Sequence, residues 1–259
     1  MHGICNLSIV PCRKKPSDKS ELTTQLLFGE TFELLEEQEK WVKIKNEHDQ
    51  YISWIDRKQF LEISEKTHHR IRKEASPLAF ELVHPLQNTS TEGLFPIVLG
   101  STLPGMKAQK IELEKNSYKY DGQVTEVPSA KKIRNSLIEN AYMYLHAPYM
   151  WGGRTPFGID CSGLTQMVYK LSGIPLLRDA SDQATLGKPI DFVEQAQPGD
   201  LAFFDNPAGR ITHVGIILGN KTILHASGKV RIDKLDHYGI YNKEKKTYTH
   251  SLRLIRSLL

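Results

Sequence analysis

Cys161, His213 and His225 are the residues of this sequence best suited to nucleophilic chemistry. In such chemistry a thiolate attacks a carbonyl carbon, an imidazole removes the thiol proton, and a third group orients that imidazole. A lone histidine in a strand is usually structural, so the argument depends on the three residues occurring together. They lie in three short segments, YMWGGRTPFGIDCS (Tyr149–Ser162), THVG (Thr212–Gly215) and LHASG (Leu224–Gly228).

Cys161 is expected to begin a helix. The apolar residues that follow it recur at the i, i+3, i+4, i+7 spacing of an amphipathic helix. Glycines upstream allow the preceding loop to turn tightly. The helix dipole and unpaired N–H groups at a helix start favour an anion, so we expect a lowered thiol pKa. A buried structural cysteine is the alternative. The apolar residues are Leu164, Met167, Val168 and Leu171, and the glycines are Gly152, Gly153 and Gly158.

His213 and His225 lie in two consecutive predicted strands, and Gly219-Asn220 between them signals a hairpin. A strict two-residue loop there would oppose His213 to Ala226 and place His225 on the other face. Both imidazoles must reach one site, so we expect a three-residue turn, Leu218-Gly219-Asn220, or a bulged equivalent. A regular two-residue hairpin would exclude an orienting role for His225.

Zinc is an alternative use of the same residues. A thiolate and two imidazoles together supply three ligands of a zinc site. The helix-start position of Cys161 and the glycine-rich loop before it favour catalysis instead. We therefore expect neither a metal nor another cofactor.

The elements that must position these residues fall into three predicted domains, 1–62, 63–126 and 127–259. Short runs of β-forming residues separated by turns predict a small barrel or sandwich at the start of the chain. A second small β domain follows. Helical spacing begins at Ser129, a candidate cap, and helix then alternates with strand. The predicted strands are 7–10, 31–35, 41–44, 51–55, 97–99, 111–113 and 118–123, and the helical positions are Ile133, Leu137, Ala141 and Leu145.

Composition excludes several classes of protein. The 259 residues exceed one typical domain of about 100–200 residues, and 39% hydrophobic with 25% charged residues suits a globular chain. No run approaches the roughly 18 apolar residues that a membrane-spanning helix needs. The net charge of +4 comes without a block of like charges, so we expect no nucleic-acid partner.

The N-terminal segment MHGICNLSIVPCRKK does not resemble a signal peptide. Asn6 and Ser8 interrupt its apolar stretch, and its basic residues come after that stretch rather than before it. We expect a cytoplasmic protein, or a periplasmic or cell-envelope protein if a signal peptide has been omitted. Cys5 and Cys12 lie in one extended segment, too far apart for a disulfide bond, and are expected to be small buried hydrophobic residues.

The segments WGG…DCSGL, HVGI and LHASG resemble the NlpC/p60 cysteine peptidases, which cleave bacterial cell-wall peptides. The resemblance covers about residues 130–259. It implies a papain-like core with Cys161 as nucleophile, His213 as base and His225 as third member. It also implies that Tyr149 helps to stabilise the oxyanion.

The front of the chain, with SELTTQLLFGE, WVKI and YISWI, resembles a bacterial SH3-type domain. Two such domains before the peptidase domain are similar to the YkfC-like subgroup, which implies an α+β chain with two small SH3-like β-barrel domains. The resemblance also implies the substrate, a murein peptide with a free N-terminal L-Ala. In that subgroup the bond from γ-D-Glu to the diamino acid, L-Lys or diaminopimelate, is cut during peptide recycling, and the first SH3-like domain walls off the cleft.

A wall that selects a free amine must supply negative charge or hydrogen-bond acceptors. On the first domain we expect Glu21, and less directly Tyr51, to do so. A solvated turn carboxylate and a core or rim aromatic are the respective alternatives. The candidates on the peptidase domain are Asp160, Ser162 and Ser181.

Three further interpretations concern the peptidase domain. Asp160 is also suited to cap the helix that begins at Cys161, which is compatible with a substrate role. Trp151 is expected either to line the cleft or to pack in the core. Arg178 is expected either to pair with a substrate carboxylate or to lie at the surface.

Two other classes of function remain open. One is a wall-binding protein without catalysis, and the other is a thiol amidase or acyltransferase on a similar core. A transferase needs an acceptor, and an amidase releases intact peptide from sugar, so product analysis separates them.

Overall fold

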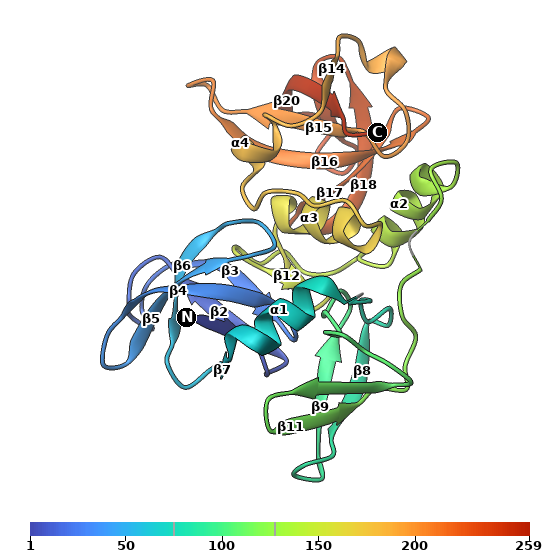
Figure 1. Cartoon of the computed structure of the whole chain (residues 1–259). Helices are drawn as coiled ribbons and strands as arrows, with labels where there is room; N and C mark the ends of the chain where they lie inside the picture. Colours follow the sequence, from blue (N-terminus) through green and yellow to red (C-terminus); the bar gives the residue numbers. More distant parts are fainter. Residues whose placement is uncertain (75, 127) are drawn as a thin grey trace. The chain divides into compact units, whose positions relative to one another are not determined.

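The computed structural model describes residues 1–74, 76–126 and 128–259. The chain forms two compact units, Met1–Glu126 and Val127–Leu259 (Figure 1). Each is described by itself. Among the described residues, no helix is both long and apolar enough to cross a lipid bilayer.

The first unit begins with a seven-stranded antiparallel sheet in the order β3-β2-β6-β5-β4-β1-β7. Alternating burial along β5 places one face of this sheet on a hydrophobic core. Cys5 and Cys12 are fully buried in that core and are not bonded to each other, which confirms their expected role. The strands are β1 (His2–Ile4), β2 (Ile9–Arg13), β3 (Leu22–Leu27), β4 (Thr31–Glu37), β5 (Trp41–Asn46), β6 (Ile52–Asp56) and β7 (Leu61–Ile63).

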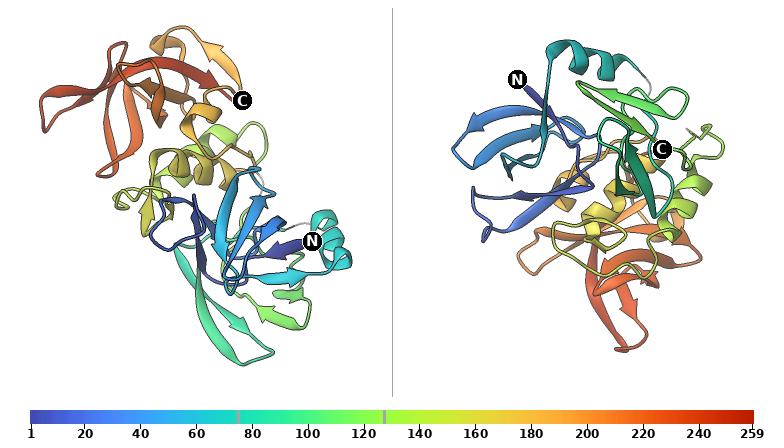
Figure 2. Two further views of the ribbon diagram at one scale, coloured as in Figure 1. Left: turned by 90° about the vertical axis from the view of Figure 1, so that its left-hand side faces the viewer. Right: turned by 90° about the horizontal axis from the view of Figure 1, so that it is seen from below.

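Helix α1 (Glu65–Lys73) follows β7 and was not predicted from the sequence. The hydroxyl of Ser64 caps it by accepting from the backbone N–H of Thr67. Figures 1 and 2 both show this helix beside the N-terminal strand β1. A four-stranded sheet in the order β10-β11-β8-β9 completes the unit. Its strands are β8 (Val83–Asn88), β9 (Gly93–Val98), β10 (Lys110–Leu113) and β11 (Asn116–Lys119).

The two sheets of the first unit share one hydrophobic cluster. Ile4 on β1 and Phe28 in the turn after β3 pack with Leu86 on β8 and Ile97 on β9. A backbone hydrogen bond from Thr102 N–H to the Phe28 carbonyl also joins the two parts. The SH3-like β regions are therefore built around a common core.

The second unit packs helices against an antiparallel seven-stranded sheet in the order β14-β20-β15-β16-β17-β18-β19. Helix α3 contacts α2, β16 and β17, and all of its residues are buried. The elements are α2 (Ile133–Tyr142), β12 (Arg154–Thr155), β13 (Gly158–Ile159), α3 (Cys161–Leu171), α4 (Ala180–Gln183), β14 (Lys188–Ile190), a 3₁₀ turn (Val193–Gln195), β15 (Leu201–Asp205), β16 (Ile211–Gly219), β17 (Thr222–Ser227), β18 (Lys229–Asp236), β19 (Gly239–Asn242) and β20 (Thr247–Ser257).

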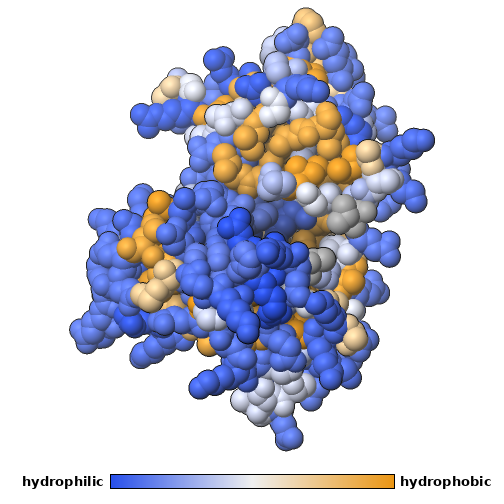
Figure 3. Space-filling view, in the orientation of Figure 1, coloured by the Kyte–Doolittle hydropathy of each residue, from blue (hydrophilic) through white to orange (hydrophobic). Residues whose placement is uncertain are grey.

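The α+β class predicted from the sequence is confirmed, but the expected start of α2 was wrong. The helix begins at Ile133, and its N-cap is Lys132 without a side-chain hydrogen bond, so Ser129 does not cap it. Ser129 instead closes a turn, since its carbonyl accepts from the N–H of Lys132. In the view of Figure 3, hydrophobic residues gather on the second unit, whereas polar residues dominate the visible surface of the first.

Gly163 in α3 gives a test of how tightly the loop before Cys161 packs on this helix. A Cβ at Gly163 would lie 2.3 Å from the carbonyl oxygen of Gly153. Gly163→Ala should therefore lower the free energy of unfolding by about 1–3 kcal/mol, as overpacking does, although alanine in an exposed helix normally stabilises by about 1 kcal/mol. Urea unfolding followed by circular dichroism measures the sign. A variant more stable than the wild type would contradict this packing.

Candidate active site

Asp160 caps the start of α3, the helix that begins at Cys161. It is the N-cap of the helix, and its Oδ1 accepts from the backbone N–H of Gly163 at 2.6 Å. Its Oδ2 accepts from the backbone N–H of Gly152 at 2.8 Å, which ties the glycine-rich loop to the helix. The predicted helix start and the capping role of Asp160 are both confirmed.

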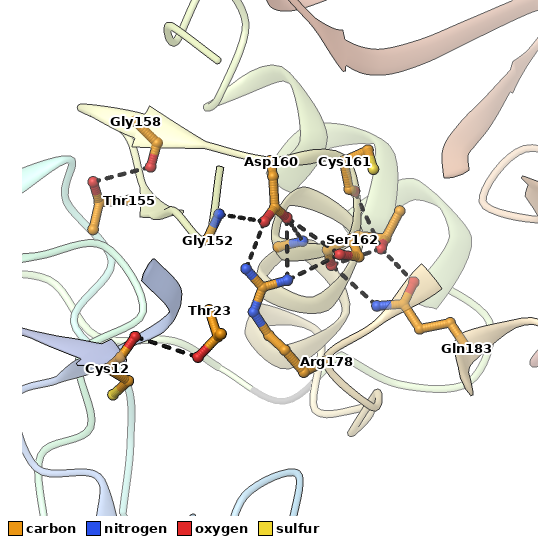
Figure 4. A network of polar contacts seen from close by, with 12 residues as sticks. Cys12, Thr23, Gly152, Thr155, Gly158, Asp160, Cys161, Ser162, Arg178 and Gln183 are labelled. Carbon is orange, nitrogen blue, oxygen red and sulfur yellow. Dashed lines mark hydrogen bonds and ion pairs between the residues drawn. The ribbon is translucent and has the colours of Figure 1, made fainter. Parts of the chain in front are cut away.

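Arg178 is buried rather than exposed, so the interpretation as a surface arginine was wrong. Its guanidinium donates to both carboxylate oxygens of Asp160, at 2.6 and 3.1 Å, and to the hydroxyl of Ser162 at 2.9 Å (Figure 4). Two donors on one carboxylate form the strong bidentate pair typical of arginine. This pair holds the residues on both sides of Cys161.

The Cys161 thiol is buried, and burial raises its pKa to about 12, with a smaller contribution from the charge of Asp160. Backbone N–H groups of Val214 and Ser162 act in the opposite direction by donating to the sulfur. The expectation of a lowered thiol pKa from the helix start was therefore wrong for the free protein, because desolvation outweighs those donors. The hydrogen bond from Val214 places the sulfur beside the residue that follows His213.

The hairpin between the two histidines carries the bulge that the sequence argument required. Gly215 is paired with His225, and the register shifts between Ile217 and Gly219. His213 shares a face with Gly215, and directly opposed residues share a face, so both imidazoles lie on one face. The bulged form is confirmed. The turn itself is Asn220-Lys221, both with positive φ, one residue later than expected.

His213 and His225 are hydrogen-bonded through Nε2 and Nδ1, 2.9 Å apart. Gly215 permits this approach, since a Cβ there would lie 3.0 Å from that of His225. Burial lowers the pKa of His213 well below its usual value, and the neighbouring His225 and His250 add to this. The imidazole of His213 is therefore neutral at neutral pH and able to accept a proton.

Asp233 on β18 is a site residue that the sequence analysis missed. Its Oδ2 lies 3.1 Å from Nε2 of His225, and Arg231 donates to both of its oxygens at 2.7 and 3.1 Å. Burial alone would raise the pKa of Asp233, but the hydrogen bonds from His225 and Arg231 lower it on balance. The spacing of Arg231 and Asp233 on one strand face was the available signal.

An ionised Asp233 sets the direction of the whole line of hydrogen bonds. A carboxylate only accepts, so Nε2 of His225 must donate to it and Nδ1 of His225 must accept from Nε2 of His213. This leaves Nδ1 of His213 without a proton, as a base for a thiol proton requires. The tautomers follow from the hydrogen-bond partners.

A third histidine, His250, lies next to His213 and His225. The ring of His250 stacks on that of His213, with centroids 4.2 Å apart, and burial lowers the pKa of His250 to about 4. One nitrogen from each of His213, His225 and His250 lies within 4.8 Å of the others, so this group has the donor set for a cation. In the structure, Nε2 of His213 and Nδ1 of His225 are hydrogen-bonded to each other.

The remaining peptidase-domain candidates differ in placement. Burial raises the pKa of Tyr149 to about 12, and the electrostatic effects of Cys161 and Asp160 add to this. The Tyr149 hydroxyl therefore lies near both groups. Trp151 is 60% exposed, which excludes its interpretation as a core aromatic. Ser162 is buried, and Ser181 is exposed on α4.

Glu21 and Tyr51 belong to the first unit. Glu21 is exposed and pairs with Lys14 at 3.0 Å, whereas Tyr51 is half-buried just before β6. Their assignment to a substrate amine stays a prediction.

Comparisons with known proteins agree with this architecture. Residues 146–251 match the NlpC/P60 family, and residues 12–60 match the bacterial dipeptidyl-peptidase SH3 domain. The chain therefore contains a domain of the NlpC/P60 cysteine peptidase family and a bacterial dipeptidyl-peptidase SH3 domain. The predicted family and class of enzyme are confirmed.

Relatives match over most of their length. The chain is 28% identical to a gamma-D-glutamyl-L-lysine dipeptidyl-peptidase of Bacillus cereus, over 81% of this chain and 68% of the relative. It is 26% identical to dipeptidyl-peptidase 6 of Lysinibacillus sphaericus, over 90% and 92%. A crystal structure of an NlpC/P60 family protein from Bacillus cereus shares the fold across both whole chains, with a TM-score of 0.84 and 21% identity.

Replacing the carboxylate behind His225 tests whether it acts through the histidines. Asp233→Asn should lower kcat of the peptidase about 10- to 100-fold, because an amide can donate and reverse the tautomers. Loss of a carboxylate that orients a metal-bound histidine has an effect of about this size. KM should stay near its wild-type value. Asp236→Asn is the matched control, since Asp236 pairs with the exposed Tyr248 hydroxyl at 2.6 Å. Equal activity of the two variants would exclude an action of Asp233 through His225 and His213.

The raised pKa of the Cys161 thiol predicts its reactivity. Only the thiolate is nucleophilic, so the rate of alkylation by iodoacetamide should rise about tenfold per pH unit from pH 7 to 10. Cys161→Ser measures the background from Cys5 and Cys12, which are buried in the first unit. A rate that is already constant below pH 7 would instead indicate a preformed thiolate–imidazolium pair.

Proposed function

We propose that this protein is a cysteine peptidase that cuts the bond between γ-D-Glu and the diamino acid of murein peptides with a free N-terminal L-Ala. The observation that carries the proposal is the hydrogen-bonded line from His213 through His225 to Asp233, beside a thiol at a helix start. The name of the Bacillus cereus relative, a gamma-D-glutamyl-L-lysine dipeptidyl-peptidase, supports this substrate class.

In the proposed reaction, Nδ1 of His213 takes the thiol proton as the sulfur of Cys161 attacks the amide carbonyl. A pKa of about 12 for the free thiol means that this transfer accompanies attack rather than preceding it. His213 then protonates the leaving amine, and water activated by the same imidazole hydrolyses the thioester. His225 and the Asp233 carboxylate stabilise the imidazolium, a charge that a neutral orienter alone would support less.

The oxyanion needs donors at the carbonyl oxygen. Backbone N–H groups at the start of α3 and the hydroxyl of Tyr149 are the proposed donors, and each such donor contributes about 2.7–4 kcal/mol in comparable sites. The raised pKa of Tyr149, to about 12, keeps its hydroxyl protonated and able to donate.

Substrate selection is assigned to groups around this centre. Asp160, Ser162 and Arg178 form one buried polar network, so we propose that they present a fixed arrangement of charges to the substrate. Ser181 and Trp151, both exposed, are proposed to contact it from the rim. Glu21 and Tyr51 are proposed to recognise the free amine.

The test is mass spectrometry of L-Ala-γ-D-Glu-L-Lys, its diaminopimelate analogue and their N-acetylated forms after incubation with the protein. Release of L-Ala-γ-D-Glu from the free peptides alone is expected, because an acetylated amine loses the charge that Glu21 would pair with. Cys161→Ala is the inactive control.

Each other outcome changes the proposal in a defined way. Cleavage of acetylated peptides as well would keep the peptidase and remove the amine gate assigned to Glu21 and Tyr51. Two further incubations separate the other classes: release of intact peptide from a muropeptide that carries its sugar would indicate an amidase, and activity only with an added amine acceptor would indicate a transferase. No reaction with any peptide would leave wall binding.

A further inference from the structure

Four side chains that commonly bind metal ions meet in the first unit, whereas the residues of the peptidase mechanism belong to the second unit. His2 lies on β1, Glu47 in the turn after β5, and Glu65 and His68 in the first turns of α1. Figures 1 and 2 show the N-terminal strand beside this helix in each view. Segments far apart in the sequence therefore bring two imidazoles and two carboxylates together.

The distances in this group show one hydrogen bond and two contacts that are too long to be hydrogen bonds. Nε2 of His68 lies 2.6 Å from Oε1 of Glu47, an ordinary charge-assisted hydrogen bond. His2 is different, since its Nδ1 lies 3.6 Å from Glu47 and its Nε2 lies 3.5 Å from Glu65. Both separations are too long for hydrogen bonds. Nδ1 of His2 is buried without a hydrogen-bond partner among the described residues.

A separation near 3.5 Å suits two ligands of one ion. Zinc binds nitrogen and oxygen at about 2.0–2.2 Å, so neighbouring ligands of a tetrahedral ion lie about 3.3–3.5 Å apart. One ligand atom from each of His2, Glu65 and His68 lies within 4.8 Å of the other two. Side-chain rotations are needed to bring such a set onto a single ion.

Glu47 determines which nitrogens face the ion. It approaches Nδ1 of His2 and Nε2 of His68, so the second nitrogen of each ring, Nε2 of His2 and Nδ1 of His68, is the one that an ion would use. A carboxylate behind a metal-binding histidine fixes the tautomer and raises the basicity of the ligand. One carboxylate here serves both imidazoles.

We propose that His2, His68 and Glu65 bind one zinc ion, with Glu47 behind the two histidines and water as the fourth ligand. The two rings are stacked, 3.6 Å apart and 9° from parallel, and must open so that both lone pairs point at the ion. Glu65 is 80% exposed and His2 is 20% exposed on its side chain, so this rotation takes place at the surface. Figure 3 shows a strongly hydrophilic surface over α1.

Bound zinc would tie β1 and α1 together and stabilise the first unit. A ligand that binds only the folded state stabilises by about 2.7 kcal/mol at a hundred times its Kd. The proposal does not depend on the peptidase reaction.

The experiment is isothermal titration calorimetry with zinc chloride on the full chain, made without a histidine tag and stripped with EDTA. The wild type should bind one more zinc ion per chain than His68→Gln. Glu65→Gln should weaken the same site at least about tenfold, which is 1.4 kcal/mol. His69→Gln is the matched control, because His69 is the exposed neighbour on the same helix.

The group of His213, His225 and His250 is present in every variant, so any zinc bound there cancels in the comparison. Identical titrations of the wild type and His68→Gln would overturn the proposal, as would an equal loss in His69→Gln. Binding weaker than about 1 mM in the wild type would do the same. If His68→Gln fails to fold, Glu65→Gln decides, because that side chain is exposed.

Discussion

The negative charge of Asp233 is the constraint from which the rest of the site follows. A buried carboxylate is costly unless hydrogen-bond donors surround it, and Arg231 and His225 supply them. Because a carboxylate only accepts, it dictates the tautomer of His225 and, through it, that of His213. A chain of two imidazoles alone has no preferred direction. The carboxylate gives it one, which leaves Nδ1 of His213 without a proton.

Burial acts on the nucleophile Cys161 and on its proposed base His213 in complementary ways. It raises the pKa of the Cys161 thiol and lowers that of His213, so both groups are neutral in the free protein. A neutral pair suits a dry site, since separated charges there would need solvation that the protein does not provide. Substrate and oxyanion donors can then stabilise the charges as they form.

A second buried charge pair performs a structural task for the same nucleophile. Arg178 and Asp160 neutralise each other, and their hydrogen bonds bind the glycine loop, the helix start and Ser162 into one network. Removing one partner of such a pair would leave an unpaired buried charge, which typically costs 3–5 kcal/mol. The pair therefore makes the position of Cys161 depend on a residue seventeen positions later.

The sequence by itself determined the local features: the helix that begins at Cys161, its Asp160 cap, the strands of both histidines and the need for a bulge between them. These follow from apolar spacing and from strand alternation, which act over a few residues. Only the tertiary structure decided that Arg178 pairs with Asp160, that Asp233 binds His225, that the thiol pKa is raised, and that His2 lies against α1. Each depends on burial or on contacts between distant segments, and sequence periodicity predicts neither.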